Sequence, residues 1–317
     1  MIKVNTPMLS NCSRGVRRYY SRVSEVLHDE KIPCSRFERF FKGFLTFDIK
    51  GGVLWSPGQG GTLISKKHIV TCHDVIDFTY YGGGVKNQIK KLIHSYIYQR
   101  ALNIVFISDS TKLEFEKVFP NNSSRKTVIK SAVDMDLVFN FKVDVLIKNK
   151  LKANQYFILV TNAMPHKNNR IFIDAIQVLS KEGVSAVIVG DLSEEDKERT
   201  KKTANILHLN GLENDELFTL VKESRGLVST SLVEGHNLTI AEALSLEKTV
   251  IASDIDVHRE FYNGYCLFFN PNDNQSLAEL LKEVYFDRIE LPVYSKQDLK
   301  CWRAVGEEYK SLFHSYK

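Results

Sequence analysis

Short apolar runs alternate with amphipathic stretches throughout the second half of the chain. The apolar runs have the length of buried strands and lie at 156–162, 185–191, 205–211, 226–231 and 249–254. Between them, apolar residues recur at helical spacing at 169–183, 214–224 and 238–247. Strands that alternate with helices in this way predict parallel βαβ units in a Rossmann-like sheet. Because ligands of such sheets bind beyond the carboxyl ends of the strands, the polar residues after each strand are the candidates for chemistry.

Residues typical of helix ends support these elements. Gly183 is placed to end the helix over 169–183, and Asn214 or Asp215 is placed to cap the next one. Asn237 is a suitable N-cap for a helix that begins at Leu238.

The first half has a less regular α/β pattern. Helical spacing appears at 15–30 and at 86–101, a short β-rich run at 68–76, and a strand, turn and helix at 102–119. The change of pattern near residue 150 predicts an N-terminal Rossmann-like domain over 1–148 and a second over 149–295. Residues 296–317 are expected to form a helix that packs back on the first domain, with Trp302 as its anchor.

Length and composition fit this division. A chain of 317 residues with 43% hydrophobic and 26% charged residues is long enough for two folded domains. Its five cysteines are scattered, so free thiols in a reducing compartment are expected. We find no signal-peptide pattern and no transmembrane run, which predicts a cytoplasmic protein.

Charge is distributed unevenly between the two halves. Residues 1–150 contain 24 Lys and Arg against 13 Asp and Glu, a balance of +11, whereas residues 151–317 contain 19 against 25, a balance of −6. A basic half suggests an anionic partner such as membrane headgroups, a phosphorylated lipid or nucleic acid. A solvated surface without a partner is the alternative.

The most informative motif lies at 229–244. Glu234 follows a predicted strand, and Glu242 comes after seven intervening residues, on the predicted helix that begins at Leu238. The free amides and the dipole of a helix N-terminus attract anions, and a carboxylate can accept both hydroxyls of a ribose. Gly235 would allow an unusual backbone and a close approach of ligand. The motif therefore fits a nucleoside diphosphate, although two surface glutamates would give the same spacing.

This stretch resembles the Glu-Gly-Phe-Gly-Leu…Glu-Ala motif of the "group 1" family of retaining GT-B glycosyltransferases. Other segments resemble the family in the same order along the chain, at 13–20, 69–75, 128–134, 158–176, 187–191, 206–221 and 249–281. The resemblance implies the GT-B fold, an α/β architecture of two Rossmann-like domains that face a central cleft.

The resemblance also implies roles at the donor phosphates. Lys167 is similar to the family's diphosphate-binding lysine, and the backbone of Asn237 and Leu238 would face the diphosphate. Gly15 would let the first helix approach the phosphates. A loop lysine and a turn glycine are the structural alternatives for Lys167 and Gly15.

Further roles concern the ribose and the transferred sugar. Glu242 is similar to the ribose-binding glutamate, and Glu234 to the catalytic glutamate placed near the sugar and phosphate. His236 would contact the donor sugar. His73, at a strand end, is the second catalytic candidate, with a purely structural histidine as the alternative.

Three positions depart from the family pattern. Asn162 stands where relatives often have an arginine, so Lys167 would act with another cation such as Arg14, Arg17 or Arg170. His236 and Asn237 replace the frequent Phe-Gly pair, and Ala132 replaces a glycine before the linker.

The implied activity is transfer of a hexose-type sugar from a nucleoside-diphosphate sugar to a glycan or lipid-linked glycan, with retention of configuration and with no metal or other cofactor. The Asp-x-Asp sequences at 134–136 and 254–256 are interpreted as loop and turn residues. A nucleotide-sugar epimerase or phosphorylase of the same fold is an alternative, and so is a non-catalytic partner subunit. Intact Glu234, Glu242 and Lys167 argue against the subunit.

Two basic stretches bear on the cellular location of the protein. Residues 86–100 combine Lys86, Lys90, Lys91 and Arg100 with apolar residues at helical spacing, and 36–44 adds a basic and aromatic run. Both fit peripheral contact with an anionic membrane at its inner face. Nucleic acid is not expected as a partner, because the aromatic residues follow helical spacing and form no open stacking platform.

Overall fold

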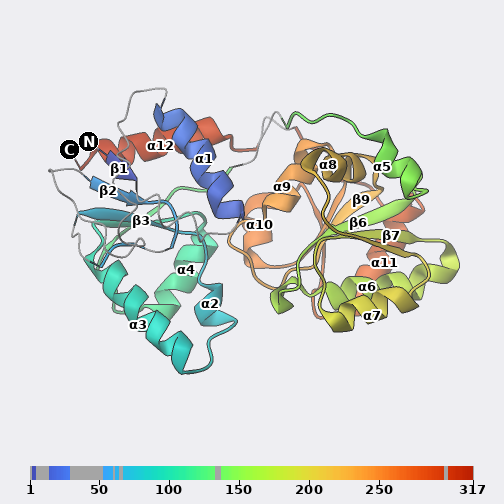
Figure 1. Ribbon diagram of the computed structural model, residues 1–317, viewed down its shortest axis with the longest axis horizontal. Helices are drawn as coiled ribbons and strands as arrows, with labels where there is room; N and C mark the ends of the chain where they lie inside the picture. Colours follow the sequence, from blue (N-terminus) through green and yellow to red (C-terminus); the bar gives the residue numbers. More distant parts are fainter. Residues whose placement is uncertain are drawn as a thin grey trace. The chain divides into compact units, whose positions relative to one another are not determined.

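The computed structural model describes residues 2–4, 14–28, 53–59, 61–63, 67–132, 137–295 and 299–316. The basic run at 36–44, the cysteines at 12 and 34, and the Asp-x-Asp sequence at 134–136 lie outside these residues. The chain divides into two compact units, each built around a parallel sheet (Figure 1). The first unit comprises Met1–Ala132, Glu234–His236 and Lys300–Lys317, and the second comprises Val133–Val233 and Asn237–Leu299.

The sheet of the first unit has five described strands in chain order. They are β1 (Ile2–Val4), β2 (Val53–Ser56), β3 (His68–Cys72), β4 (Asn103–Phe106) and β5 (Arg125–Val128). All neighbouring pairs are parallel. The helices are α1 (Arg14–His28), α2 (Ile76–Thr79), α3 (Val85–Arg100), α4 (Asp109–Val118) and α12 (Trp302–His314).

Helices cover both faces of this sheet (Figure 1). On one face, α12 packs against α1, and its Tyr309 and Phe313 rings lie 5.1 Å and 5.6 Å from the Trp55 ring of β2. On the other face, α3 and α4 bury Tyr98 and Phe115 against the strands. The C-terminal helix is therefore part of the first unit, and Trp302 packs edge-on against Tyr19 of α1.

The second unit has six described strands in an order that reverses once. They are β6 (Tyr156–Val160), β7 (Ser185–Val189), β8 (Ile206–Leu209), β9 (Gly226–Ser229), β10 (Val250–Ser253) and β11 (Leu267–Phe269). The order across the sheet is β11-β10-β9-β6-β7-β8, and all pairs are parallel. This is the doubly wound order of a dinucleotide-binding sheet, with the switch point between β6 and β9.

Side chains from alternate positions of the strands fill two cores, one on each face of this sheet. Tyr156 and Ile158 of β6 belong to one core, and Phe157 and Leu159 belong to the other. Because both faces are buried, the strands appear in the sequence as continuous apolar runs. The helices are α5 (Val143–Lys148), α6 (Asn169–Leu179), α7 (Glu194–Lys202), α8 (Asn214–Glu223), α9 (Leu238–Ser245), α10 (Asp256–Tyr262) and α11 (Asn274–Tyr285).

Two details differ from the sequence predictions. The N-cap of α8 is Glu213, not Asn214 or Asp215, because Glu213 and Glu216 form a reciprocal capping box. The units divide at Ala132 and at Leu299, whereas the sequence suggested 148 and 295; the intervening α5 packs against α8 within the second unit. The prediction that Gly183 ends the helical stretch is confirmed: α6 stops at Leu179, a 3₁₀ turn (Ser180–Glu182) continues it, and Gly183 then adopts the left-handed conformation at φ 82°.

Candidate functional site

The switch point of the second unit brings two loops together. One loop follows β6 and leads to Lys167, and the other follows β9 and leads to α9. In doubly wound sheets the ligand crevice opens where the strand order reverses, beyond the carboxyl ends of the two central strands. The residues singled out from the sequence at 161–167 and 230–242 therefore lie where this topology positions a ligand.

The turn that carries Lys167 is tied to the end of β9. Pro165–Lys167 forms a 3₁₀ turn, in which Lys167 N donates to Met164 O at 2.9 Å. Thr230 Oγ1 donates to Lys167 O at 2.6 Å, and Leu232 N donates to His166 O at 2.8 Å. Two hydrogen bonds thus fix the backbone of the lysine while its side chain stays half-buried.

The cation that could accompany Lys167 is not supplied by its nearest neighbours in sequence. Asn162 is exposed, and its Oδ1 accepts from Met164 N at 3.0 Å, so its side chain shapes the turn. Arg170 lies 3.5 Å from the Asp174 carboxylate and 4.0 Å from that of Glu195. Of the cations that the sequence suggested, Arg170 therefore already has acidic partners, and Arg17 is exposed on α1.

Asn237 begins α9 in a left-handed conformation, as its N-cap. Its φ and ψ are both 77°, and its side chain accepts from Ile240 N at 3.5 Å. The prediction of Asn237 as the cap is confirmed. The amide also donates to Ser229 Oγ at 2.8 Å and to His258 Nε2 at 3.0 Å. Because the side chain is fully engaged within the protein, only backbone groups of Asn237 are available to a ligand.

His258 was not predicted as a site residue from the sequence, yet its ring holds the start of α9 through a hydrogen bond with Asn237. Its ring is completely buried, and Nδ1 donates to Ser253 O at 2.9 Å. Nε2 must then accept from Asn237, which defines a neutral ring with its proton on Nδ1. Ser253 Oγ continues the network to Ser231 O at 2.5 Å. A buried polar network therefore connects the ends of β9 and β10 to the helix N-terminus.

The short segment Glu234–His236 lies between β9 and α9 in the sequence, but its contacts assign it to the first unit. A Cβ atom on Gly235 would lie 2.0 Å from His73 O, so only glycine fits beside this carbonyl. Gly235 is not among the glycines with positive φ, so its role is close packing on the protein backbone and not the unusual backbone expected from the sequence. Glu234 is half-buried, and His236 is buried.

His73 follows β3 and is buried and neutral. Burial lowers the pKa of its imidazole to about 4, against the opposing effect of the backbone hydrogen bond to Pro57. Nε2 lies 2.7 Å from Pro57 O and must donate to it, which leaves Nδ1 as the acceptor of the ring. The ring also packs edge-on against Tyr19, with centroids 4.9 Å apart. This arrangement suits orientation of a hydroxyl group better than proton transfer near neutral pH.

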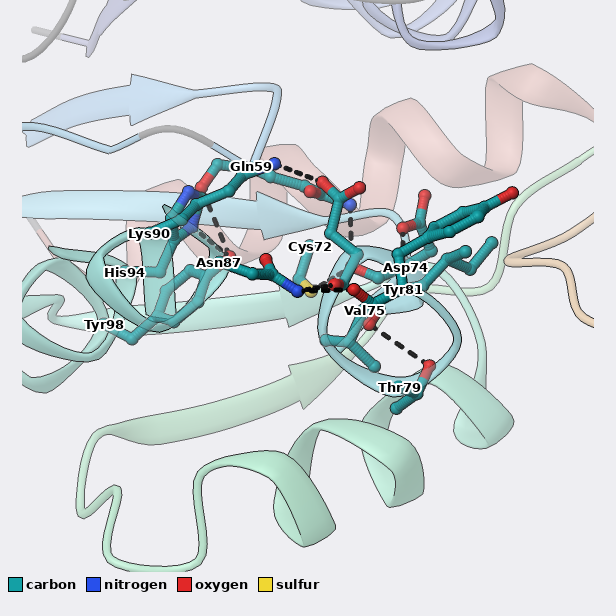
Figure 2. Close-up of polar contacts among 12 residues, drawn as sticks. Gln59, Cys72, Asp74, Val75, Thr79, Tyr81, Asn87, Lys90, His94 and Tyr98 are labelled. Atoms are coloured by element: carbon teal, nitrogen blue, oxygen red, sulfur yellow. Dashed lines mark hydrogen bonds and ion pairs between the residues drawn. The ribbon is translucent and has the colours of Figure 1, made fainter. Parts of the chain in front are cut away.

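Asp74 is a further candidate that the sequence did not single out. Burial raises the pKa of its carboxyl, and the carboxylates of Asp77 and Glu234 raise it further, against hydrogen bonds from Gln59 and Ile76. Figure 2 shows the turn around it, in which Oδ1 accepts from Ile76 N at 3.1 Å and Gln59 Nε2 donates to the carbonyl at 2.7 Å. A perturbed carboxyl beside one of the predicted glutamates is typical of a functional site.

The remaining predicted residues take these places. Glu242 is half-buried on α9, one turn after Leu238, and Gly15 is the second residue of α1 and half-buried. Among the described residues, the second unit holds Lys167, Asn237, Leu238 and Glu242, and the first holds Gly15, His73, Glu234 and His236.

Asp254, in the second Asp-x-Asp sequence, pairs with Arg259 at 2.7 Å, which lowers the pKa of its carboxyl. Within the described ranges, no group of three or more His, Cys, Asp or Glu residues could hold a metal ion.

Solved structures with the same fold share both units. HepE from Anabaena, solved with UDP and glucose, aligns with a TM-score of 0.70 at 15% identity and covers 99% of each chain. WaaG, a glycosyltransferase involved in lipopolysaccharide biosynthesis, aligns with a TM-score of 0.67 at 10% identity and covers 98% of this chain and 95% of WaaG. The protein thus has the two-unit α/β architecture of the GT-B class, which confirms the predicted fold.

Sequence comparisons find similarity to one glycosyltransferase family and to two of its curated relatives. Residues 154–287, within the second unit, match the sequence model of the family Glycosyl transferases group 1. Over 232 residues the chain is 25% identical to the O-antigen chain mannosyltransferase RfbU of Salmonella typhimurium, covering 69% of this chain and 61% of RfbU. It is also 25% identical to O-antigen chain mannosyltransferase B of Escherichia coli, covering 70% and 62%. The match thus spans less than two thirds of the length of either relative.

Proposed function

We propose that this protein is a retaining, metal-independent glycosyltransferase that moves a hexose-type sugar from a nucleoside-diphosphate sugar to a glycan or lipid-linked glycan acceptor. The observation that carries the proposal is the switch point between β6 and β9, where the Lys167 turn is hydrogen-bonded to the strand end that leads to Glu234 and α9. The matched family and the O-antigen mannosyltransferases support synthesis of a surface polysaccharide as the process.

The donor would be held mainly by the second unit. The N–H groups of Leu238 and Thr239, in the first turn of α9, would bind the diphosphate together with the Lys167 ammonium, since the Asn237 side chain already accepts from Ile240 N. Glu242 would accept the two ribose hydroxyls. As the sugar leaves, negative charge builds up on the diphosphate, and a lysine fixed at its backbone stabilises that charge without reorganisation.

Residues of the first unit would act on the sugar. Glu234 would lie beside the transferred sugar, whose ring gains positive charge as the bond to phosphate breaks. His73, neutral and with only Nδ1 free to accept, would orient a sugar hydroxyl. Gly15 would let α1 approach the phosphates, and the departing phosphate itself would take the acceptor proton. His236 would form one wall of the sugar site.

The decisive test is binding of nucleotide sugars, followed by a variant of the ribose site. A panel of nucleoside-diphosphate sugars should contain at least one member that raises the melting temperature, because a ligand of the native state stabilises it. Glu242→Gln should then weaken binding of that sugar nucleotide and of the free diphosphate equally, by about 1–3 kcal/mol. Glu290→Gln, an exposed position in the second unit, is the matched control. Unchanged affinity in Glu242→Gln would remove this residue from the site.

Product analysis separates the activity from its alternatives. Transfer to an acceptor, with the anomeric configuration of the donor kept in the product and with activity preserved in EDTA, is the expected result. Release of an altered sugar nucleotide without any acceptor would identify an epimerase instead. Binding without hydrolysis or transfer of any donor would identify a non-catalytic subunit, and loss of activity in EDTA that magnesium restores would overturn the metal-independent mechanism.

A further inference from the structure

Helix α3 is apolar on two opposite faces. Its inner face buries His94, Ile97 and Tyr98 in the first unit. Its outer face exposes five large apolar side chains, which we call the α3 stripe: Val85 (73% exposed), Ile89 (53%), Leu92 (70%), Ile93 (39%) and Tyr96 (50%). At 100° per residue these positions fall within about 100° of the helix circumference, opposite the buried face. Exposed apolar residues that are contiguous in this way mark an interaction surface, whereas single ones do not.

The charges on α3 all have one sign. The helix contains Lys86, Lys90, Lys91 and Arg100, and it has no aspartate or glutamate. Lys90 forms an ion pair with Asp77, and Arg100 lies over the Tyr96 ring at 5.2 Å from its centroid. The long lysine stems can lie along apolar surface and keep their ammonium groups at a polar boundary. Around the helix, Lys86 and Lys90 thus lie beyond one edge of the α3 stripe, and Lys91 lies farther round beyond the other.

Polar groups and aromatic rings surround the stripe. A groove of about 800 Å³ runs beside it, lined by apolar side chains and by amide, hydroxyl and ammonium groups. The apolar lining residues are Leu92, Tyr96, Val118, Phe119 and Pro120, and the polar ones are Gln88, Lys91, Ser95, Gln99, Asn121 and Asn122. Before the helix, Tyr80 and Tyr81 pack edge-on with centroids 5.0 Å apart. Tyrosine at the boundary of an apolar face is typical of a membrane interface.

We propose that the α3 stripe docks on an anionic lipid surface. Such a surface offers hydrocarbon for the apolar side chains and negative headgroups for the flanking cations. A second copy of the chain fits less well, because a two-fold interface would bring the same cations face to face. Nucleic acid fits less well too, since four of the five stripe residues are aliphatic and so have no flat ring that could stack on bases. The docking on a lipid surface does not rest on the proposed function. Only a further step, in which that surface also supplies a lipid-linked acceptor, would rest on it.

Vesicle co-sedimentation tests the docking without any donor or acceptor, so its failure is distinct from a failure of the proposed transfer. The protein should bind phosphatidylcholine vesicles that contain phosphatidylglycerol, should not bind pure phosphatidylcholine, and should dissociate as salt rises. Ile89→Ser/Leu92→Ser should weaken binding by about 10-fold or more, because both apolar contacts are lost. The control Leu113→Ser/Val178→Ser removes two equally exposed apolar side chains from α4 and α6 and should bind as the wild type does.

Charge is tested separately. Lys86→Gln/Lys91→Gln should weaken binding by about 25-fold, roughly 5-fold for each lysine. Lys152→Gln/Lys181→Gln, at exposed positions in the second unit, should leave binding unchanged. No binding to either vesicle type, or equal losses in the α3 variants and their controls, would overturn the proposal. Dimers in solution that Ile89→Ser/Leu92→Ser converts to monomers would assign the stripe to self-association instead.

Discussion

The side-chain amide of Asn237 lies 3.0 Å from Nε2 of His258, a partner 21 residues away in the sequence. The left-handed backbone conformation at this position is one that favours glycine. Here the same conformation is occupied by asparagine, whose side chain also binds Ser229 and caps α9. The helix terminus assigned to the diphosphate is therefore held by side chains as well as by the backbone.

This relationship predicts an unusual order of stability at position 237. Asn237→Gly keeps the left-handed backbone but leaves the buried His258 ring without its donor, which should lower the free energy of unfolding by about 1–3 kcal/mol. Asn237→Ala loses the same contacts and also strains the backbone at φ 77°, so it should be less stable by about a further 1 kcal/mol. Urea unfolding of both variants measures the difference. An alanine variant as stable as the glycine variant would contradict the left-handed conformation.

Gly235 should tolerate no side chain. Gly235→Ala would place a Cβ 2.0 Å from His73 O, a backbone atom, so the segment must shift and stability should fall by about 1–3 kcal/mol. Gly83→Ala is the control, because a Cβ there has no atom within 4 Å and the backbone is not left-handed. Thermal unfolding of both variants checks the prediction, and equal melting temperatures would show that the close contact with His73 does not exist in solution.

Lys167 should matter for the ligand and not for the fold. Lys167→Ala should change the free energy of unfolding by less than about 0.5 kcal/mol and should weaken nucleoside-diphosphate binding by about 10-fold or more, because a charge-assisted contact is lost. Lys167→Arg should restore part of the affinity, since it keeps the charge. Calorimetry with the free diphosphate, with Lys152→Ala as the control, measures these effects. Full affinity in Lys167→Ala would mean that other cations hold the phosphates.

Two buried histidines should weaken the fold in mild acid. Burial lowers the pKa of His73 and of His94 to about 4, from 6.5 in the unfolded chain. Below pH 6.5 the unfolded state therefore binds protons that the folded state does not, so stability falls as pH drops toward 4, by up to about 3 kcal/mol for each histidine. His94→Gln should reduce this slope. Urea unfolding across the window checks it, and parallel pH profiles for the variant and the wild type would contradict the lowered pKa.

Much of the second unit could be predicted because its signals are local. Strands buried on both faces give continuous apolar runs, and Asn237 is a recognisable cap next to an apolar helix. Helix α7 was missed because its residues, Glu194–Lys202, are almost all charged, and ion pairs such as Lys197 with Glu194 replace an apolar face. The cap of α8 was misassigned because a glutamate caps well only in the reciprocal arrangement with Glu216.

The parts of the site that could not be predicted depend on long-range packing. His258 looks like an ordinary helix residue until the turn after β10 brings it beneath Asn237. Asp74 owes its raised pKa mainly to burial, which no local pattern reports. The need for glycine at position 235 likewise cannot be inferred from the local sequence, since the atom that excludes a side chain there is the backbone oxygen of His73.

The late position of helix α12 in the sequence affects how the first unit folds during translation. Tyr309 on this helix bonds Thr71 at 2.7 Å and Tyr19 at 3.1 Å, and Trp55 donates to the same threonine at 3.1 Å. The ribosome synthesises these partners long before Tyr309, with the whole second unit in between. During translation the second unit can therefore complete its fold while the earlier sheet still shows an uncovered aromatic face. Nascent chains stalled before residue 302 should be the species that chaperones bind and proteases degrade.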